Sequence, residues 1–299
     1  MPSGISLFCP FSLAKNCDTN MNSQSMKKPS LTVLFITKNE EYHIGAAIDN
    51  VKDIAEEIYV VDSGSTDQTV AIAESKGAKV VYHKFEGFGA QWNFALSLPI
   101  RTAWTMKMDP DERLGESLKA ELREALKTDR KDVGFSFYRI LWFMGHRMHG
   151  VKAEVQRVWR TGECRFTNIS VNEHPLIAGK WCKLKGVMEH FDSKDLTDWV
   201  SKQNHYTFKE AFQRYNGEQL AVQPRIFGGQ LERRMFWKWL YRRLPLRYLI
   251  GNLYNFFGRG AWRSGVYGWR WVKCREMVSR MAEYKYFEMV GAEKLKEEG

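Results

Sequence analysis

From residue 31 onward, short apolar runs alternate with amphipathic stretches. Residues 31–37 and 57–61 are dominated by apolar and β-branched side chains, which predicts strands buried on both faces of a parallel sheet. The stretch 39–51 between them has helical periodicity. Its predicted buried face consists of Ile44, Ala47, Ile48 and Val51.

The same alternation continues toward the middle of the chain. Ser65–Thr69 supplies capping residues for a helix to Lys76, and Gly77 is suited to end it. Further strands are predicted at 78–82 and 103–108, and further helices at 92–98, 115–127 and 195–206. This order predicts an α/β fold in which helices flank a doubly wound, mostly parallel sheet.

The chain divides into three regions by composition. Residues 1–29 are polar and turn-rich without a basic start, so a disordered extension is expected rather than a secretory signal. Residues 30–209 carry the alternating pattern, as a nucleotide half (30–130) and an acceptor half (131–209). Residues 210–299 are expected to be helical. No apolar run reaches the roughly 18 residues that span a membrane.

Polar clusters follow three of the predicted strands, where sheets of this class bind ligands. They are Thr37–Glu40, Asp62–Ser65 and Asp109–Glu112. No glycine-rich fingerprint follows the first strand, which argues against a dinucleotide oxidoreductase. The five cysteines lack CxxC spacing and favour a cytosolic protein without a zinc or redox site.

Asp109 and Asp111 place two carboxylates one residue apart around Pro110. Such a pair could hold a divalent cation that neutralises a diphosphate leaving group, or it could be a solvated turn that caps a helix. Asp62 could contact a ribose or base, or cap the next helix. The glycines of segment 87–91 could approach a phosphate, or form a plain loop.

Four segments together resemble the family 2 glycosyltransferases of GT-A fold. They are ITKNEE (36–41), VVDSGSTDQT (60–69), GFGAQWN (87–93) and DPDE (109–112). Their order and separations most resemble the branch that glucosylates the inner core of bacterial lipopolysaccharide. The resemblance covers residues 31–209 and departs from the usual pattern at Pro110, where alanine is common.

The resemblance implies a set of roles in the nucleotide half. Asp111 would be the direct ligand of Mg²⁺ or Mn²⁺, and Asp109 would lie near the ribose or the metal. The other expected nucleotide-binding residues are Thr37, Asn39, Glu40, Asp62, Gly64, Gln91 and Asn93.

In the acceptor half, Glu173 is the expected catalytic base, because an inverting transfer needs a carboxylate to deprotonate the acceptor hydroxyl. Considered without the resemblance, Glu173 is better explained as a surface loop carboxylate, and Asn172 departs from the family's histidine. His190 is expected to be a late metal ligand or a structural histidine. The residues expected near the donor sugar or the acceptor are Glu112, Arg157, His174 and Tyr206.

The region 233–280 carries twelve Lys or Arg, twelve aromatic residues and one acidic residue, within a chain of net charge +10. Segment 233–243 predicts a helix in the headgroup layer of an anionic membrane. Part of the region could instead be a packing element. Nucleic acid is not expected, because no recognised binding motif is present and the strand-end acidic cluster would repel phosphate unless a metal intervened.

The resulting expectation is an inverting, metal-dependent hexosyltransferase in the cytoplasm, peripherally bound to the inner face of the cytoplasmic membrane. Its donor would be UDP-glucose, and its acceptor a lipid-anchored saccharide such as an inner-core heptose. Alternatives are a transferase for a capsule or lipid-linked oligosaccharide, or a non-catalytic binder. A glycoside hydrolase is disfavoured, because Asp109 and Asp111 are too close to flank a glycosidic bond.

Overall fold

The computed structural model describes residues 30–127, 132–167, 175–217 and 223–297. They form two compact units. The first, here called the sheet unit, comprises residues 30–142 and 152–192 of the described chain. The second, called the helical unit, comprises 143–151 and 193–297. Residues 193–209, grouped above with the acceptor half, therefore cluster with the C-terminal helices.

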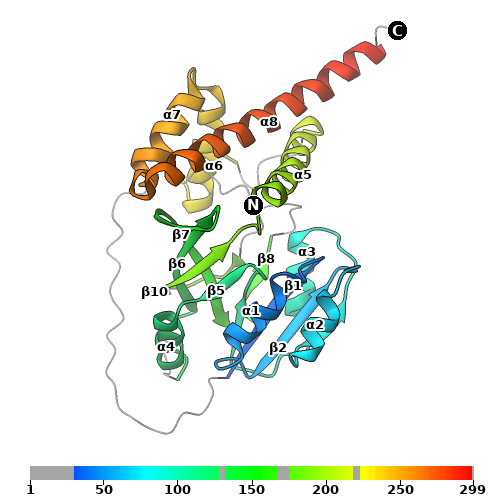
Figure 1. Ribbon diagram of the computed structural model, residues 1–299, viewed down its shortest axis with the longest axis vertical. Coiled ribbons are helices and arrows are strands. Elements are labelled where there is room, and N and C mark those ends of the chain that lie inside the picture. Colours follow the sequence, from blue (N-terminus) through cyan, green and yellow to red (C-terminus); the bar gives the residue numbers. More distant parts are fainter. Residues whose placement is uncertain (1–29, 128–131, 168–174, 218–222, 298–299) are drawn as a thin grey trace. The chain divides into compact units, whose positions relative to one another are not determined.

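The sheet unit begins with alternating strands and helices (Figure 1). In chain order they are β1 (Leu31–Thr37), α1 (Ile44–Val51), β2 (Glu57–Asp62), α2 (Thr69–Ser75), β3 (Lys79–Tyr82), α3 (Phe88–Leu96), β4 (Trp104–Lys107), β5 (Glu112–Leu114) and α4 (Glu116–Ala125). The later strands are β6 (Gly134–Phe143), β7 (His146–Arg160), β8 (Arg165–Phe166), β9 (Pro175–Leu176) and β10 (Trp181–Phe191).

Eight of these strands form one sheet in the order β3-β2-β1-β4-β7-β6-β10-β5. Neighbours from β3 to β4 are parallel, as are β6 and β10, whereas β7 against β4 and β5 against β10 are antiparallel. The mostly parallel sheet with flanking helices confirms the predicted fold class.

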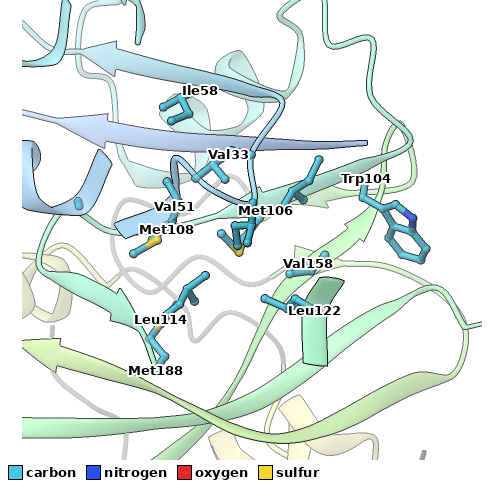
Figure 2. Close-up of a cluster of buried hydrophobic side chains, with 14 of the residues drawn as sticks. Val33, Val51, Ile58, Trp104, Met106, Met108, Leu114, Leu122, Val158 and Met188 are labelled. Atoms are coloured by element: carbon cyan, nitrogen blue, oxygen red, sulfur yellow. The ribbon is translucent and has the colours of Figure 1, made fainter. Parts of the chain in front are cut away.

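Strand β1 is buried on both faces, as its continuous apolar pattern predicts. Val33 and Phe35 join one core cluster with Ile44 of α1, whereas Leu34 joins a second cluster with Trp92 of α3. Because successive side chains of a strand point to opposite faces, α1 and α3 cover opposite sides of the sheet. Figure 2 shows the first cluster, in which side chains from β1, β4, α4 and β10 converge.

The four predicted core residues of the first helix are all fully buried, but α1 starts at Ile44 rather than near Asn39. Asn39 has a left-handed backbone (φ +55°), and the N–H groups of residues 39–41 donate to side chains of the loop after β2. Amides bound in this way cannot join a helical ladder, so the first turn is displaced toward the C-terminus.

The helical unit contains α5 (Leu196–Tyr215), α6 (Gln230–Arg243), α7 (Arg247–Leu253), the π-helical turn η1 (Tyr254–Gly258), the 3₁₀ turn η2 (Ala261–Ser264) and α8 (Gly265–Glu297). Helix α5 was predicted over 195–206, but it starts at Leu196 and continues past Tyr206; Asp195 is its N-cap, and its side chain accepts from the Asp198 N–H at 2.8 Å. Within the described ranges, every helix is too short or too polar to cross a bilayer.

Gly150 is expected to be intolerant of a side chain. A Cβ at this position would collide with the backbone carbonyl of Gly260, which has φ +75° and turns the chain between η1 and η2. Gly150→Ala should therefore reduce the free energy of unfolding by about 1–3 kcal/mol, as overpacking typically does. Gly291→Ala in α8 is the matched control, because its Cβ would meet nothing. Equal denaturation midpoints for the two variants would contradict the close approach.

Candidate active site

The first two predicted polar clusters lie side by side at one edge of the sheet. Strands β1 and β2 are parallel and in register from Thr32 and Glu57 to Thr37 and Asp62, so their carboxyl ends coincide. Strand β4, which leads into the third cluster, pairs in parallel with the other side of β1. The sheet therefore gathers all three clusters at one edge, as the strand order predicts.

The loops that follow β1 and β2 are interlocked by hydrogen bonds. The Asn39 side-chain oxygen accepts from the Thr66 N–H at 2.8 Å, and the Asn39 N–H donates to Ser65 Oγ at 2.8 Å. One residue on, the Glu40 N–H donates to the buried Thr69 Oγ1 at 2.7 Å. The Ser and Thr residues of the 60–69 segment thus bind the backbone of the 37–41 segment, which makes one preorganised platform from two motifs.

Asp62 is the anchor of this platform. Its Oδ1 accepts from the N–H groups of Gly64 and Ser65 at 2.9 and 2.8 Å, and its Oδ2 accepts from the hydroxyls of Thr37 and Ser65 at 2.9 and 2.5 Å. The residue is buried, and Gly64 turns the loop with φ +85°. Because its buried carboxylate accepts four hydrogen bonds, Asp62 holds the loop in its conformation.

Asp62→Ala is expected to weaken donor binding through loss of loop order. The variant leaves the buried Thr37 hydroxyl and three part-buried donors without an acceptor, which costs about 1–3 kcal/mol. Calorimetric titration with UDP should show weaker binding, and the free energy of unfolding should fall. Asp53→Ala, which removes a half-exposed carboxylate paired with Arg123 and Lys119, should leave UDP binding unchanged and lower the free energy of unfolding by less. Wild-type UDP affinity in the Asp62 variant would contradict this role.

Gln91 and Asn93 lie in α3, which begins at Phe88, four residues before the predicted start. The segment expected to be a glycine loop is therefore the first turn of a helix. The buried Gln91 amide bridges Ser63 Oγ (3.0 Å) and the His83 carbonyl (3.2 Å), while Asn93 exchanges two hydrogen bonds with the Phe166 backbone at 2.8 and 3.0 Å. These contacts join α3 to the β2 loop and to β8.

The Asp109–Arg113 segment is held as a rigid turn. The Asp109 N–H donates to Glu112 Oε2 at 3.0 Å, and the Glu112 N–H donates back to the Asp109 carbonyl at 3.0 Å. The Arg113 guanidinium donates to the carbonyls of Pro110, Glu112 and His43. Proline has no backbone N–H, and the two hydrogen bonds between Asp109 and Glu112 use the N–H groups of those residues. Pro110 therefore fits this turn.

A buried ionic network lies under the turn. Arg157 Nη2 is 2.9 Å from Asp109 Oδ2 and also binds Glu112, while Arg139 Nη1 is 3.1 Å from Glu112 Oε1. Burial pushes the pKa of Asp109 upward, but the charges of Arg157 and Lys107 outweigh it, so that pKa lies below its ordinary value. Burial would lower the pKa of Arg157, and Glu112 and Asp109 more than offset that effect.

Asp111 meets His190 and Asp192 beside this network. The antiparallel pairing of β5 with β10 sets Glu112 opposite His190, and the Phe191 N–H donates to the Asp111 carbonyl at 2.8 Å. His190 Nε2 is consequently 3.3 Å from Asp111 Oδ2, and one ligand atom from each of the three residues lies within 4.8 Å of the others. Asp192 is not among the residues predicted from the sequence, although it lies at the end of a strand, as Asp62 and Asp109 do.

The donor chemistry of this cluster fits a divalent cation. Two carboxylates and one imidazole, with ligand atoms within 4.8 Å of one another, can converge on a single ion. Mg²⁺ and Mn²⁺ commonly take one or two carboxylates and complete their coordination with phosphate oxygens and water. The three side chains come from the β4–β5 turn and the end of β10, so the sheet itself sets their spacing.

The remaining predicted residues are distributed differently. Glu112 is fully buried with its carboxylate bound by two arginines, so it and Arg157 belong to the network under the turn. Tyr206 lies half-buried in α5 of the helical unit. Glu173 and His174 lie outside the described residues.

Comparisons with known proteins show which proteins this chain is similar to. The family model described as glycosyl transferase family 2 matches residues 32–184. An uncharacterized glycosyltransferase of Rickettsia conorii is 32% identical over 206 residues, which cover 64% of this chain and 72% of the relative. LpsC of Rhizobium meliloti, a lipopolysaccharide core biosynthesis glycosyltransferase, is 28% identical over 251 residues, which cover 81% of this chain and 86% of LpsC. A solved mannosyltransferase of Pyrobaculum calidifontis, in complex with GDP-Man and Mn²⁺, aligns with 87% of this chain and 88% of its own at 13% identity and a TM-score of 0.49.

Proposed function

The chain belongs to glycosyl transferase family 2, and on this basis we propose that it transfers a hexose from a nucleoside diphosphate donor with a divalent cation and inversion at the anomeric carbon. The observation that carries the proposal is the cluster of Asp111, His190 and Asp192 at the carboxyl edge of the sheet. It adjoins the DPDE turn that the resemblance assigns to the diphosphate.

Asp111, His190 and Asp192 would hold the cation. When bound, the cation supplies positive charge to the diphosphate as the glycosidic bond breaks. The chain's own contribution is preorganisation: the network of Arg157 with Asp109 and Glu112 fixes the turn that presents Asp111. A site whose charges are already fixed needs little reorganisation in the transition state.

Contacts with the nucleoside and the ribose are assigned to the platform formed by the β1 and β2 loops. Thr37, Asn39, Glu40, Asp62 and Gly64 act there mainly by holding the loops in shape, which supports an indirect role for the buried Asp62. Glu173 remains the proposed general base for the acceptor hydroxyl.

The proposed donor is UDP-glucose and the proposed acceptor is a lipid-linked saccharide such as a lipopolysaccharide inner-core heptose. The similarity to LpsC over most of both chains supports the lipopolysaccharide class. A capsule precursor or lipid-linked oligosaccharide is the alternative acceptor. A lipid-linked acceptor would require the enzyme to work at the inner face of the cytoplasmic membrane.

Calorimetric titration of UDP with Mn²⁺, with Mg²⁺ and with EDTA tests the donor site. We expect UDP binding that requires the metal, and turnover of UDP-hexose that EDTA abolishes. GDP and the other nucleoside diphosphates serve as comparison ligands. Failure of every nucleoside diphosphate to bind in the presence of metal would overturn the proposed function.

A further inference from the structure

The segment α7–η1 exposes apolar side chains and turns polar side chains inward, which is the reverse of an ordinary surface helix. Its most exposed side chains are Leu249 (53% exposed), Ile250 (40%), Leu253 (50%) and Phe257 (63%). Leu249, Leu253 and Phe257 follow one another at intervals of four residues, and Ile250 precedes Leu253 by three. The four side chains therefore share one broad face of the helical segment. No residue of α7 is buried, and its exposed face is apolar throughout.

The polar side chains of the same segment point the other way, to α8. Asn252 Nδ2 donates to Glu276 Oε2 at 2.7 Å, and Arg247 and Tyr248 both bind Glu283. Hydrogen bonds from Asn252, Arg280 and Lys273 lower the pKa of Glu276 to about 2, so this carboxylate stays ionised. In water the opposite arrangement is favoured, with leucines inside and amides outside.

Turn η2 and the start of α8 extend the apolar face and surround it with cations. Trp262 of η2 and Val266 and Trp269 of α8 are about half exposed and are spaced by four and three residues. Arg263 and Arg270, each next to one of these tryptophans in the sequence, are exposed, and no Asp or Glu occurs in the sequence between Glu232 and Glu276. Aromatic and aliphatic side chains edged by arginine suit the boundary between lipid headgroups and acyl chains, where each nearby cation adds to the attraction of an anionic surface.

We propose that the exposed apolar residues of α7, η1 and the start of α8 insert into the headgroup layer of an anionic bilayer. We call this surface the apolar rim; it is defined by Leu249, Leu253, Phe257, Trp262, Val266 and Trp269. The inference deepens the proposed function, because it names the surface through which the enzyme would reach a lipid-linked acceptor. The described helices cannot cross the bilayer, so the rim lies in the interface.

Helix α6, which the sequence alone indicated as the interfacial helix, is less suited to this role. Its Lys238 and Arg242 lie 3.7 and 3.0 Å from Glu210 of α5, and Met235 is buried. These cations are therefore partly neutralised within the protein. Helix α6 thus packs within its own unit. The side chains of the apolar rim remain about half exposed, and the ring contacts of Phe257 and Trp269 with Phe256 leave them so.

The exposed aliphatic side chains of the apolar rim distinguish between its possible binding partners. Nucleic acid is bound by cations and stacking aromatics, and gains nothing from exposed Leu249, Leu253 and Val266. A second copy of this chain would bring the same excess of arginine to the interface, where like charges repel. An anionic bilayer satisfies both the apolar face and the surrounding cations.

Flotation of the full-length protein with lipid vesicles tests the proposal. The vesicles are phosphatidylcholine alone or phosphatidylcholine mixed with phosphatidylglycerol. We expect binding only with the anionic lipid, weakened by salt. The double variant Leu253→Gln and Phe257→Gln should bind at least about tenfold more weakly, because it replaces two apolar side chains that would leave water on insertion into the bilayer. Both positions are exposed, so folding should be unaffected.

The matched control is Tyr82→Gln with Leu176→Gln, which removes two equally exposed apolar side chains from the sheet unit. It should bind vesicles like the wild type. Equal vesicle binding by the rim variant and the wild type would overturn the proposal, as would wild-type binding to RNA but not to vesicles, or a rim-dependent dimer in sedimentation. UDP binding with Mn²⁺ is measured on every variant, so failure of the rim is distinguishable from failure of the donor site.

Discussion

Asp111→Asn is expected to lower kcat/KM for sugar transfer by about a thousandfold, equivalent to about 4 kcal/mol of transition-state stabilisation. The substitution removes a charged side chain from the cluster with His190 and Asp192, which we propose holds the cation that stabilises the leaving diphosphate. Metal-dependent UDP binding should be lost in the same variant. Initial rates with UDP-hexose and calorimetry with Mn²⁺ measure the two effects.

Two further variants show whether the cluster acts as one site. His190→Gln and Asp192→Asn should each reduce UDP affinity in the presence of Mn²⁺, with less effect than Asp111→Asn. Asp49→Asn, which alters a surface carboxylate paired with Lys76, is the control and should behave as wild type. If the Asp111 variant bound UDP with Mn²⁺ as tightly as wild type, the metal site would have to be sought elsewhere.

Arg157→Gln is expected to reduce the free energy of unfolding by about 3–5 kcal/mol at pH 7. The variant leaves the buried carboxylates of Asp109 and Glu112 without their shared cation, and an uncompensated buried charge is costly. Denaturant unfolding measures the change. Arg165→Gln is the control, because Arg165 is exposed on β8 and should tolerate the substitution.

The loss of unfolding free energy in the Arg157 variant should depend on pH, and the direction of that dependence follows from the pKa of Asp109. In the wild type the pKa of Asp109 is depressed, so its contribution is complete above the unfolded-state pKa of about 4 and is lost as the pH falls through the lower folded-state pKa. Without Arg157, burial dominates and the pKa of Asp109 rises. The difference in unfolding free energy should therefore begin to shrink as the pH falls through the raised pKa of Asp109 in the variant, above about 4, and should shrink further below about 4 as the wild type loses its own contribution. A pH-independent difference would indicate lost packing rather than lost charge pairing.

Local pattern was sufficient to predict the frame of the fold. The strand at 31–37, the buried face of α1 and the turn at Gly77 with φ +85° all follow from residue type and spacing over a few positions. These features depend on which side chains avoid water and which backbone angles glycine allows. Neither requires knowledge of a distant partner. The polar motifs were likewise predicted to follow the strand ends, and the parallel pairing of β1 with β2 and β4 brings them to one edge of the sheet.

Side-chain partners, in contrast, depend on strand pairing. Residues 112–114 appeared to be part of a polar turn, and they form β5 only because β10 pairs with them. That pairing brings His190 and Asp192 to Asp111, and the β4–β7 register places Arg157 beneath Asp109. No local periodicity encodes contacts across that distance in the chain.

The family, the sheet and the gathering of the polar clusters at one edge follow from the amino-acid sequence alone, because they depend on short-range hydrophobic patterns and an ordered set of motifs. Which carboxylates gather with His190 and which are buried against arginine depends on tertiary packing. Packing also leaves the leucines of α7 exposed while Asn252 points toward α8. Composition records which side chains a segment contains, but only packing determines which of them remain in contact with the surroundings.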